Sequence, residues 1–197
     1  MEEQKTIVVA SGNKGKLKEI SEIFKNYTVI SLKEMEKILG KKLEVNEEKD
    51  TFQDNALQKA IELSKQLGEG YICMADDSGI SIDALDGFPG LHTARWMDAD
   101  DHTKNIALLE KLKGVPKKER TCHYTTAIAI ADYNIANCCE DVLDGFVSDE
   151  CKGDNGFGFD EIFELDNGKT LAEISSEEKY KISPRKNALE KIKKYIL

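Results

Sequence analysis

The chain has 197 residues, of which 40% are hydrophobic and 33% charged, so it is long enough for one globular domain with a full core. Its formal net charge of −9 argues against a protein that binds nucleic-acid backbones, but it permits a small phosphorylated ligand held by local lysines. No apolar run reaches the roughly 20 residues that span a bilayer, and five cysteines lack CxxC spacing, so we expect a cytoplasmic protein with reduced thiols and no membrane partner.

A glycine-rich turn separates the first predicted strand from the first predicted helix. The apolar, β-branched run Thr6–Ala10 predicts a buried strand, and apolar residues at helical spacing after Lys16 predict a helix. The turn Ser11–Lys16 therefore leads into a helix amino terminus, which is a natural site for an anion. It matches neither GxxxxGK[ST] nor GxGxxG, so by itself it also fits an ordinary strand-to-helix turn.

A second helix is predicted from about Thr51 to Leu67. Thr51 and Asp54 fit a capping pattern, and apolar residues at helical spacing give a buried stripe. Asn55 and Lys59 lie four positions apart on one face of this helix. They point either at a common ligand or at solvent.

Two adjacent carboxylates, Asp76 and Asp77, follow the apolar run 71–74. Such a pair is costly to bury unless it holds a cation or accepts strong hydrogen bonds. Because the apolar run 80–85 resumes the fold, we predict that the pair lies at a turn at the carboxyl end of a strand. This position favours a magnesium site, and the alternative is a loop whose Asp and Ser side chains cap a turn.

The middle of the chain predicts one helix and two neighbouring strands. The helix is predicted over Thr103–Lys113, and alternating residues predict a strand over Thr121–Ala131. The run Val142–Val147 is expected to pair with that strand across a turn at Asn134–Asn137. The whole pattern predicts an α/β protein with a mixed sheet flanked by helices, in a single domain over residues 1–197.

A second glycine-rich stretch, residues 152–160, carries two aromatic side chains. Its glycines permit close backbone approach. Phe157 and Phe159 suit stacking on a nucleobase, or else they are core residues beside a tight turn.

Two further helix starts are predicted near the carboxyl end. Thr170–Glu173 reads as a capping box that opens a short helix, and Ser183 with Pro184 begins the last helix. Lys179 and Arg185 then flank a helix amino terminus as a basic rim, unless they are ordinary surface charges.

Taken in order, these stretches resemble the noncanonical purine nucleoside triphosphate pyrophosphatases, the inosine/xanthosine triphosphate family. The resemblance covers essentially the whole chain. The matching stretches are Ser11–Lys16, Thr51–Phe52, Asn55–Ala56, Lys59–Ala60, Ala75–Gly79, Asp83–Leu85, Gly87, Pro89–Gly90, Ala94–Arg95, Gly156–Asp160, Ile162–Phe163, Thr170, Ala172–Glu173, Glu178–Lys179, Ser183 and Arg185.

This resemblance implies a two-lobed α/β fold around a long mixed sheet, with the active-site cleft between the lobes and a homodimeric assembly. It implies Mg²⁺-dependent hydrolysis of ITP, dITP and XTP to the monophosphate and pyrophosphate, which cleanses the nucleotide pool. The expected partner is therefore a small-molecule nucleoside triphosphate.

The resemblance also implies individual roles. Asp77 would be the proton acceptor and, with Glu47, a metal ligand. The residues themselves leave open which of Asp76 and Asp77 is the base, and only the resemblance favours Asp77. The implied substrate-binding residues are Ser11, Gly12, Asn13, Lys14, Gly15, Lys16, Lys59, Ser78, Phe157, Gly158, Phe159, Asp160, Lys179 and Arg185.

Three positions depart from the family pattern. Ser11 stands where Thr is common, Glu161 where Pro is usual, and Pro184 where the family usually carries His. The last change removes an imidazole that contacts the base, so base preference stays open. The alternatives are a nucleotide-binding protein without turnover, or the same chemistry on a different modified triphosphate.

Overall fold

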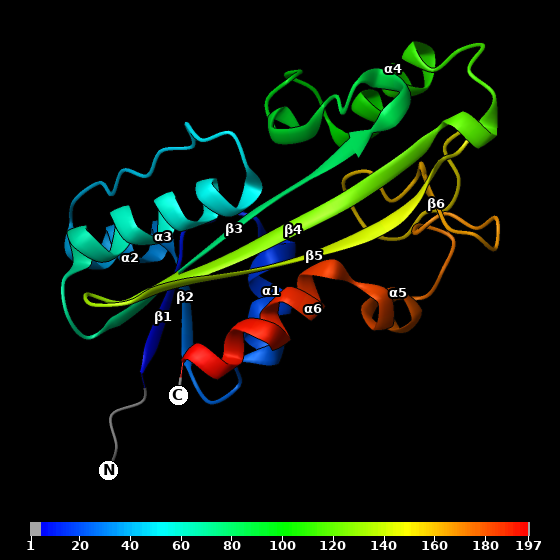
Figure 1. Cartoon of the computed structure of the whole chain (residues 1–197). Helices are drawn as coiled ribbons and strands as arrows, with labels where there is room; N and C mark the ends of the chain where they lie inside the picture. Colours follow the sequence, from blue (N-terminus) through cyan, green and yellow to red (C-terminus); the bar gives the residue numbers. More distant parts are fainter. Residues whose placement is uncertain (1–4, 197) are drawn as a thin grey trace. The chain divides into compact units, whose positions relative to one another are not determined.

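The computed structural model describes residues 5–196 and contains one six-stranded sheet with flanking helices (Figure 1). The sheet order is β2-β1-β3-β4-β5-β6. The strands are β1 (Thr6–Val9), β2 (Thr28–Ser31), β3 (Tyr71–Ile82), β4 (Thr121–Ala131), β5 (Ala136–Val147) and β6 (Phe163–Glu164). The helices are α1 (Lys14–Ile23), α2 (Leu32–Leu39), α3 (Phe52–Leu67), α4 (Asp101–Lys111), α5 (Ser176–Ile182) and α6 (Pro184–Ile192).

The sheet is mixed, which confirms the predicted α/β class. Strand β1 pairs parallel with both β2 and β3, whereas β5 pairs antiparallel with β6. Within the described residues, no helix is long and apolar enough to cross a membrane.

The contacts divide the chain into two compact units. The first unit comprises the chain up to Asp77, Thr126–Asp141 and the segment from Arg185 onward, and the second comprises Ser78–Thr125 and Val142–Pro184. Strands β3, β4 and β5 each contribute residues to both units. The single-domain assignment over residues 1–197 stays a prediction.

In the first unit, alternate residues of the strands face different helices. Figure 1 shows α3 on one side of these strands and α1 with α6 on the other. Val8, Cys73 and Ala75 pack with the apolar stripe of α3, and Val9 and Met74 pack with α1 and α6. This alternation follows from the two-residue period of a strand. The same alternation determines which face of the sheet each polar side chain of β3 points to.

The predicted turn at Asp76 and Asp77 is wrong, because β3 runs without a break from Tyr71 to Ile82. The two carboxylates point to opposite faces of the strand, and each meets cationic side chains there. Asp76 is paired with Lys16 and Arg185, and Asp77 is paired with Lys59. Their charges are compensated inside the fold, so no solvent-facing turn is needed.

Helix α3 and strand β4 have the predicted bounds. Thr51 caps α3 by accepting a hydrogen bond from the backbone N–H of Asp54 at 3.0 Å. Two other elements begin earlier than predicted. Helix α4 starts at Asp101 because Asp100 caps it, and β5 starts at Ala136, directly after the turn that follows β4.

The short helix predicted at Thr170–Glu173 is also wrong. The backbone N–H of Thr170 does donate to Glu173 Oε2 at 2.8 Å, which is half of a capping box. The N–H groups of Leu171 and Ala172, however, donate to carbonyls of residues 163 and 160, so the segment forms a turn. A complete capping box lies at Ser175 and begins α5, while α6 starts at Pro184 as predicted.

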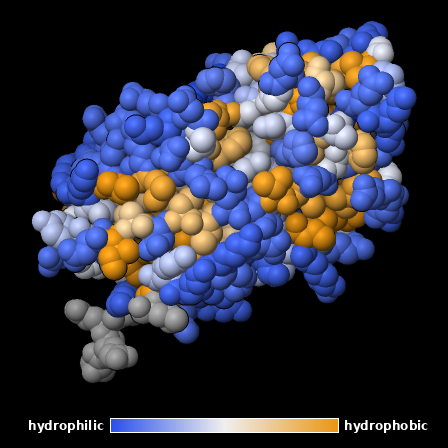
Figure 2. Space-filling model, in the orientation of Figure 1, coloured by the Kyte–Doolittle hydropathy of each residue, from blue (hydrophilic) through white to orange (hydrophobic). Residues whose placement is uncertain are grey.

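The second unit has its own apolar core. Ile80 and Ile82 of β3, Leu108 of α4 and Phe163 of β6 are fully or almost fully buried there. Figure 2 shows a face that is mostly hydrophilic with separate hydrophobic patches, as expected for a chain rich in charged residues.

Candidate functional site

A buried lysine joins two carboxylates in the first unit. Helix α3 positions Lys59, which is only 4% exposed, and β3 positions Asp77. The ammonium Nζ lies 2.6 Å from Glu47 Oε1 and 3.1 Å from Asp77 Oδ1, and it donates to the carbonyl of Asp76 at 3.0 Å. A buried ammonium requires such partners. The alternative that Lys59 faces solvent is therefore excluded.

One carboxylate oxygen of Asp77 has no hydrogen-bond partner in the part of the chain that the structure describes. Its Oδ2 is buried and accepts no hydrogen bond from residues 5–196. Burial raises the pKa of Asp77 above its ordinary value, Lys59 opposes the rise, and Glu47 adds to it. A carboxyl group with a raised pKa and a vacant oxygen can accept a proton or bind a cation.

Asp76 has the opposite electrostatic setting. It is 3% exposed, and its Oδ2 accepts a hydrogen bond of 2.7 Å from Arg185 Nε, while Oδ1 is paired with Lys16 Nζ. Arg185 also contacts Glu19 Oε2 at 3.2 Å. Burial disfavours the charged form of Asp76, but Lys16 and Arg185 outweigh it and hold the pKa far below the usual range. Asp76 therefore stays ionised and anchors two cations.

The turn Ser11–Lys16 lies at the start of α1, as the sequence predicts. Asn13 caps the helix, because its Oδ1 accepts hydrogen bonds from the N–H groups of Gly15 at 2.9 Å and Lys16 at 3.1 Å. Ser11 Oγ in turn accepts one from the N–H of Asn13 at 3.1 Å. Two backbone donors of the first turn are thus already bound, while Gly12 and Lys14 are exposed. Charge for an anion here comes from the lysines.

An aromatic ring and a lysine meet in the second unit. Lys179 of α5 is paired with Asp160, and its Nζ lies 4.7 Å from the centre of the Phe157 ring. Asp160 Oδ2 also accepts a hydrogen bond from the N–H of Phe157 at 2.8 Å. Gly156 is required here, because its φ is +84° and a Cβ would lie 2.0 Å from Asp160 Oδ2.

Two residues of α4 hold the same loop and were missed in the sequence. Asn105 Nδ2 donates to the carbonyl of Gly158 at 2.9 Å, and Asp101 Oδ2 accepts from its N–H at 2.8 Å. Only their position at the start of an amphipathic helix marks them. Phe159 packs against the core of the second unit, so one of the two aromatics is indeed a core residue.

Arg185 and Lys179, which the sequence predicts as one basic rim, are each paired with a carboxylate. Arg185 belongs to the first unit and binds Asp76 and Glu19, whereas Lys179 belongs to the second and binds Asp160. No pattern in the sequence pairs Glu19 with Arg185. Ser78 directly follows Asp77 in β3 and is partly exposed.

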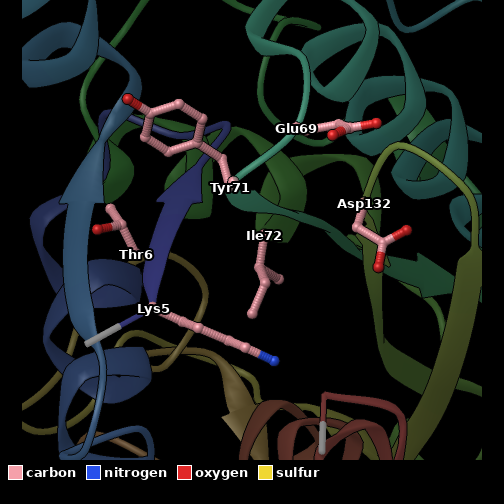
Figure 3. A pocket seen from close by; sticks show the side chains of 7 residues that line it. Lys5, Thr6, Glu69, Tyr71, Ile72 and Asp132 are labelled. Carbon is pink, nitrogen blue, oxygen red and sulfur yellow. The ribbon is translucent and has the colours of Figure 1, made fainter. Parts of the chain in front are cut away.

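A cavity of about 670 Å³ lies elsewhere in the first unit, at the amino ends of β1 and β3 (Figure 3). Among the residues that line it are Lys5, Glu69, Tyr71 and Asp132. None of the predicted site residues lines this cavity. It therefore does not bear on the roles predicted for them.

An α/β sheet that carries lysines and carboxylates beside a strand-to-helix turn is an arrangement found in proteins that bind phosphorylated ligands. The chain belongs to the Ham1 family, whose family model matches residues 7–195. This confirms the family predicted from the sequence.

Individual relatives are similar to this chain over almost its whole length. A dITP/XTP pyrophosphatase of Caldanaerobacter subterraneus subsp. tengcongensis is 42% identical over 196 residues, covering 97% of this chain and 96% of the relative. A dITP/XTP pyrophosphatase of Thermoanaerobacter sp. (strain X514) is 40% identical over 194 residues, covering 97% and 96%. The structure of the Staphylococcus aureus Ham1 protein superposes with a TM-score of 0.85 at 32% identity and covers 98% of each chain.

Proposed function

We propose that this chain is a nucleoside triphosphate pyrophosphohydrolase. Its substrates would be the noncanonical purine nucleotides ITP, dITP and XTP, and its products the monophosphate and pyrophosphate. The observation that carries the proposal is Asp77, a partly buried carboxyl group with a raised pKa beside Lys59 and Glu47, whose buried Oδ2 has no hydrogen-bond partner among residues 5–196. The names of its full-length relatives support the choice of substrate.

Glu47 and Asp77 would hold a divalent cation, and we propose Mg²⁺. The donor set fits, because Mg²⁺ prefers carboxylate oxygens and Asp77 Oδ2 has no protein partner in the described part of the chain. When bound, the cation would supply positive charge to the phosphate oxygens and polarise a nearby water.

Asp77 would act as the general base of the hydrolysis. A water oxygen attacks the α-phosphorus and forms a new P–O bond, while Asp77 takes its proton. The bond from the α-phosphorus to the bridging oxygen breaks, and pyrophosphate leaves with that electron pair. A raised pKa brings Asp77 closer to neutral pH, where general bases are most effective.

The lysines would stabilise the charge that spreads over the phosphate oxygens. Lys14 and Lys16 belong to the turn Ser11–Lys16, whose exposed Gly12 and Asn13 let phosphate approach the backbone. Lys59 forms an ion pair with Asp77 and would therefore place a positive charge beside the base. Asp76 would act by holding Lys16, not by exchanging protons, because its ion pairs keep it ionised.

We propose that the base is bound by the loop Phe157–Asp160 and Lys179 of the second unit. The partly exposed ring of Phe157 would stack on the base, and Lys179 would contact a base oxygen. We also propose that Ser78, which directly follows Asp77 in β3, contacts the substrate. Arg185 would contribute through Asp76, which it holds.

We also propose a homodimer, which rests on the resemblance alone, and a cytoplasmic location, which rests on the cysteine usage. Light scattering coupled to size-exclusion chromatography measures the assembly directly. A mass of one chain would contradict this part of the proposal and leave the catalytic part standing.

Phosphorus NMR after incubation with ITP and Mg²⁺, with ATP and GTP in parallel, tests the function. We expect IMP and pyrophosphate, formed faster than the products from ATP or GTP. The Asp77→Asn variant should lose turnover, whereas Asp166→Asn, an exposed carboxylate outside the site, should keep it. Orthophosphate with IDP would reject the mechanism, and binding without turnover would leave a nucleotide-binding protein.

A further inference from the structure

Three side chains with different donor atoms converge in the second unit. His102 lies in the first turn of α4, Cys151 follows β5, and Glu161 follows the loop Phe157–Asp160. Their ligand atoms all lie within 4.8 Å of one another. His102 Nδ1 is 2.8 Å from Glu161 Oε2, and Cys151 is hydrogen-bonded to Glu161. His102 is distant in the sequence from Cys151 and Glu161, and no common motif links the three residues.

We propose that His102, Cys151 and Glu161 form a binding site for a borderline-soft transition metal ion of the zinc type. Imidazole nitrogen, thiolate sulfur and carboxylate oxygen are the three donors that Zn²⁺ takes in proteins. Mg²⁺ selects oxygen donors instead, so this set does not duplicate the role proposed for Glu47 and Asp77. With three protein ligands, the fourth tetrahedral position is open to solvent or to a further ligand.

The distances fit such an ion after small movements of the side chains. Zinc bonds of about 2.0 to 2.3 Å hold tetrahedral donor atoms about 3.5 Å apart. The imidazole and the carboxylate are already closer than that, and a metal would take the place of the proton that they share. His102 is the most exposed of the three side chains, so the ion can enter from solvent.

A buried amide supports the carboxylate ligand. Asn105 is fully buried, and its Nδ2 lies 3.4 Å from Glu161 Oε2, as expected of a group that orients a metal ligand. Its Oδ1 has no hydrogen-bond partner among residues 5–196.

The site would restrain the loop that is proposed to bind the base. Asn105 holds Gly158 by a second hydrogen bond, and Glu161 adjoins Asp160 in the chain. Glu161 is also the position where this sequence departs from the Pro of the family pattern. The proposed site is therefore a feature of this chain and does not follow from family membership.

Cobalt titration of the full chain tests the proposal. Co²⁺ replaces Zn²⁺ and gives an intense near-ultraviolet charge-transfer band only when a thiolate binds it, and excess Mg²⁺ occupies oxygen-only sites. We expect one equivalent of Co²⁺ to produce the band, Zn²⁺ to abolish it, and both Cys151→Ser and His102→Ala to lose it. Cys139→Ser, which removes another partly buried thiol, should keep it. Circular dichroism verifies that each variant folds.

The absence of a band in the wild-type chain, or a band that survives Cys151→Ser, would overturn the site. If Cys151→Ser does not fold, X-ray absorption on the zinc-loaded wild-type chain decides: one sulfur neighbour supports the proposal, and a shell without sulfur refutes it. Neither readout depends on nucleotide hydrolysis.

Discussion

Replacing Asp76 by Asn should destabilise the chain strongly although the two side chains have almost the same shape. The carboxylate has a fully buried side chain and is paired with Arg185 and Lys16. Removing one partner of a buried ion pair costs about 3–5 kcal/mol, because the remaining charge is left buried. Arg185 keeps Glu19 at 3.2 Å, and the Lys16 side chain is 18% exposed, so both cations can be partly compensated. We therefore expect a loss of about 3 kcal/mol.

Urea denaturation followed by circular dichroism measures this loss. The midpoint should fall at an unchanged slope, because the surface exposed on unfolding does not change. A loss of about 3 kcal/mol is large against the 5–15 kcal/mol of a typical domain. Asp166→Asn, at an exposed position, is the matched control and should change the stability by less than about 0.5 kcal/mol.

The ion pairs of Asp76 with Lys16 and Arg185 also predict that the stability of the chain depends on pH in the acidic range. The pKa of Asp76 in the folded chain lies below its unfolded value of about 3.9, because Lys16 and Arg185 outweigh the burial. Its contribution is fully present above that unfolded value and is lost as the pH falls through the folded pKa. The wild-type chain should therefore lose its advantage over Asp76→Asn on acidification. A loss below about 1 kcal/mol at neutral pH, or a difference independent of pH, would refute the reasoning.

Three further predictions concern other parts of the chain. Gly156→Ala should destabilise the chain by more than about 1 kcal/mol, because the residue has positive φ and the new Cβ would meet Asp160, and an unchanged urea midpoint would contradict this. Pro184→His should raise the ratio of kcat/KM for ITP over ATP by restoring an imidazole, and an equal ratio would refute the role of this position. The hydrogen bond to Asp144 raises the pKa of His123, so its stabilising effect is present below about pH 6.5 and is lost as pH rises through the folded pKa. The melting temperatures of wild type and His123→Gln should accordingly converge from pH 6 to pH 9, and a constant difference would exclude this linkage.

Local signals in the sequence predict much of the fold. The capping residue Thr51 marks the start of α3, and the alternation of Thr121–Ala131 gives both ends of β4. These elements depend on neighbours a few residues away, so a pattern suffices. Thr170–Glu173 shows the limit of the same logic, because backbone hydrogen bonds to residues 160 and 163 override a local capping signal.

In the candidate site, too, local motifs can be predicted from the sequence and long-range contacts cannot. The turn Ser11–Lys16 and the loop Phe157–Asp160 are visible as motifs, whereas the contacts made by their charged groups depend on distant residues. Arg185 lies 109 positions from Asp76 along the chain, and Lys16 lies 60 positions away from it. No spacing rule connects such residues. The sequence consequently names many residues of the candidate site, misses others such as Asp101 and Asn105, and leaves the pairing undetermined.

Asp76 and Asp77 show why this pairing matters for chemistry. A turn would leave both carboxylates in similar surroundings, and the sequence then offers no reason to choose between them. In the continuous strand β3 the two side chains point to opposite faces, so one meets Lys16 and Arg185 while the other meets Lys59 and Glu47. The pKa of the first falls and that of the second rises. Strand geometry thus gives two identical neighbours different surroundings, so that Asp76 is held as an anion at neutral pH, whereas Asp77 is the residue that we propose to exchange a proton.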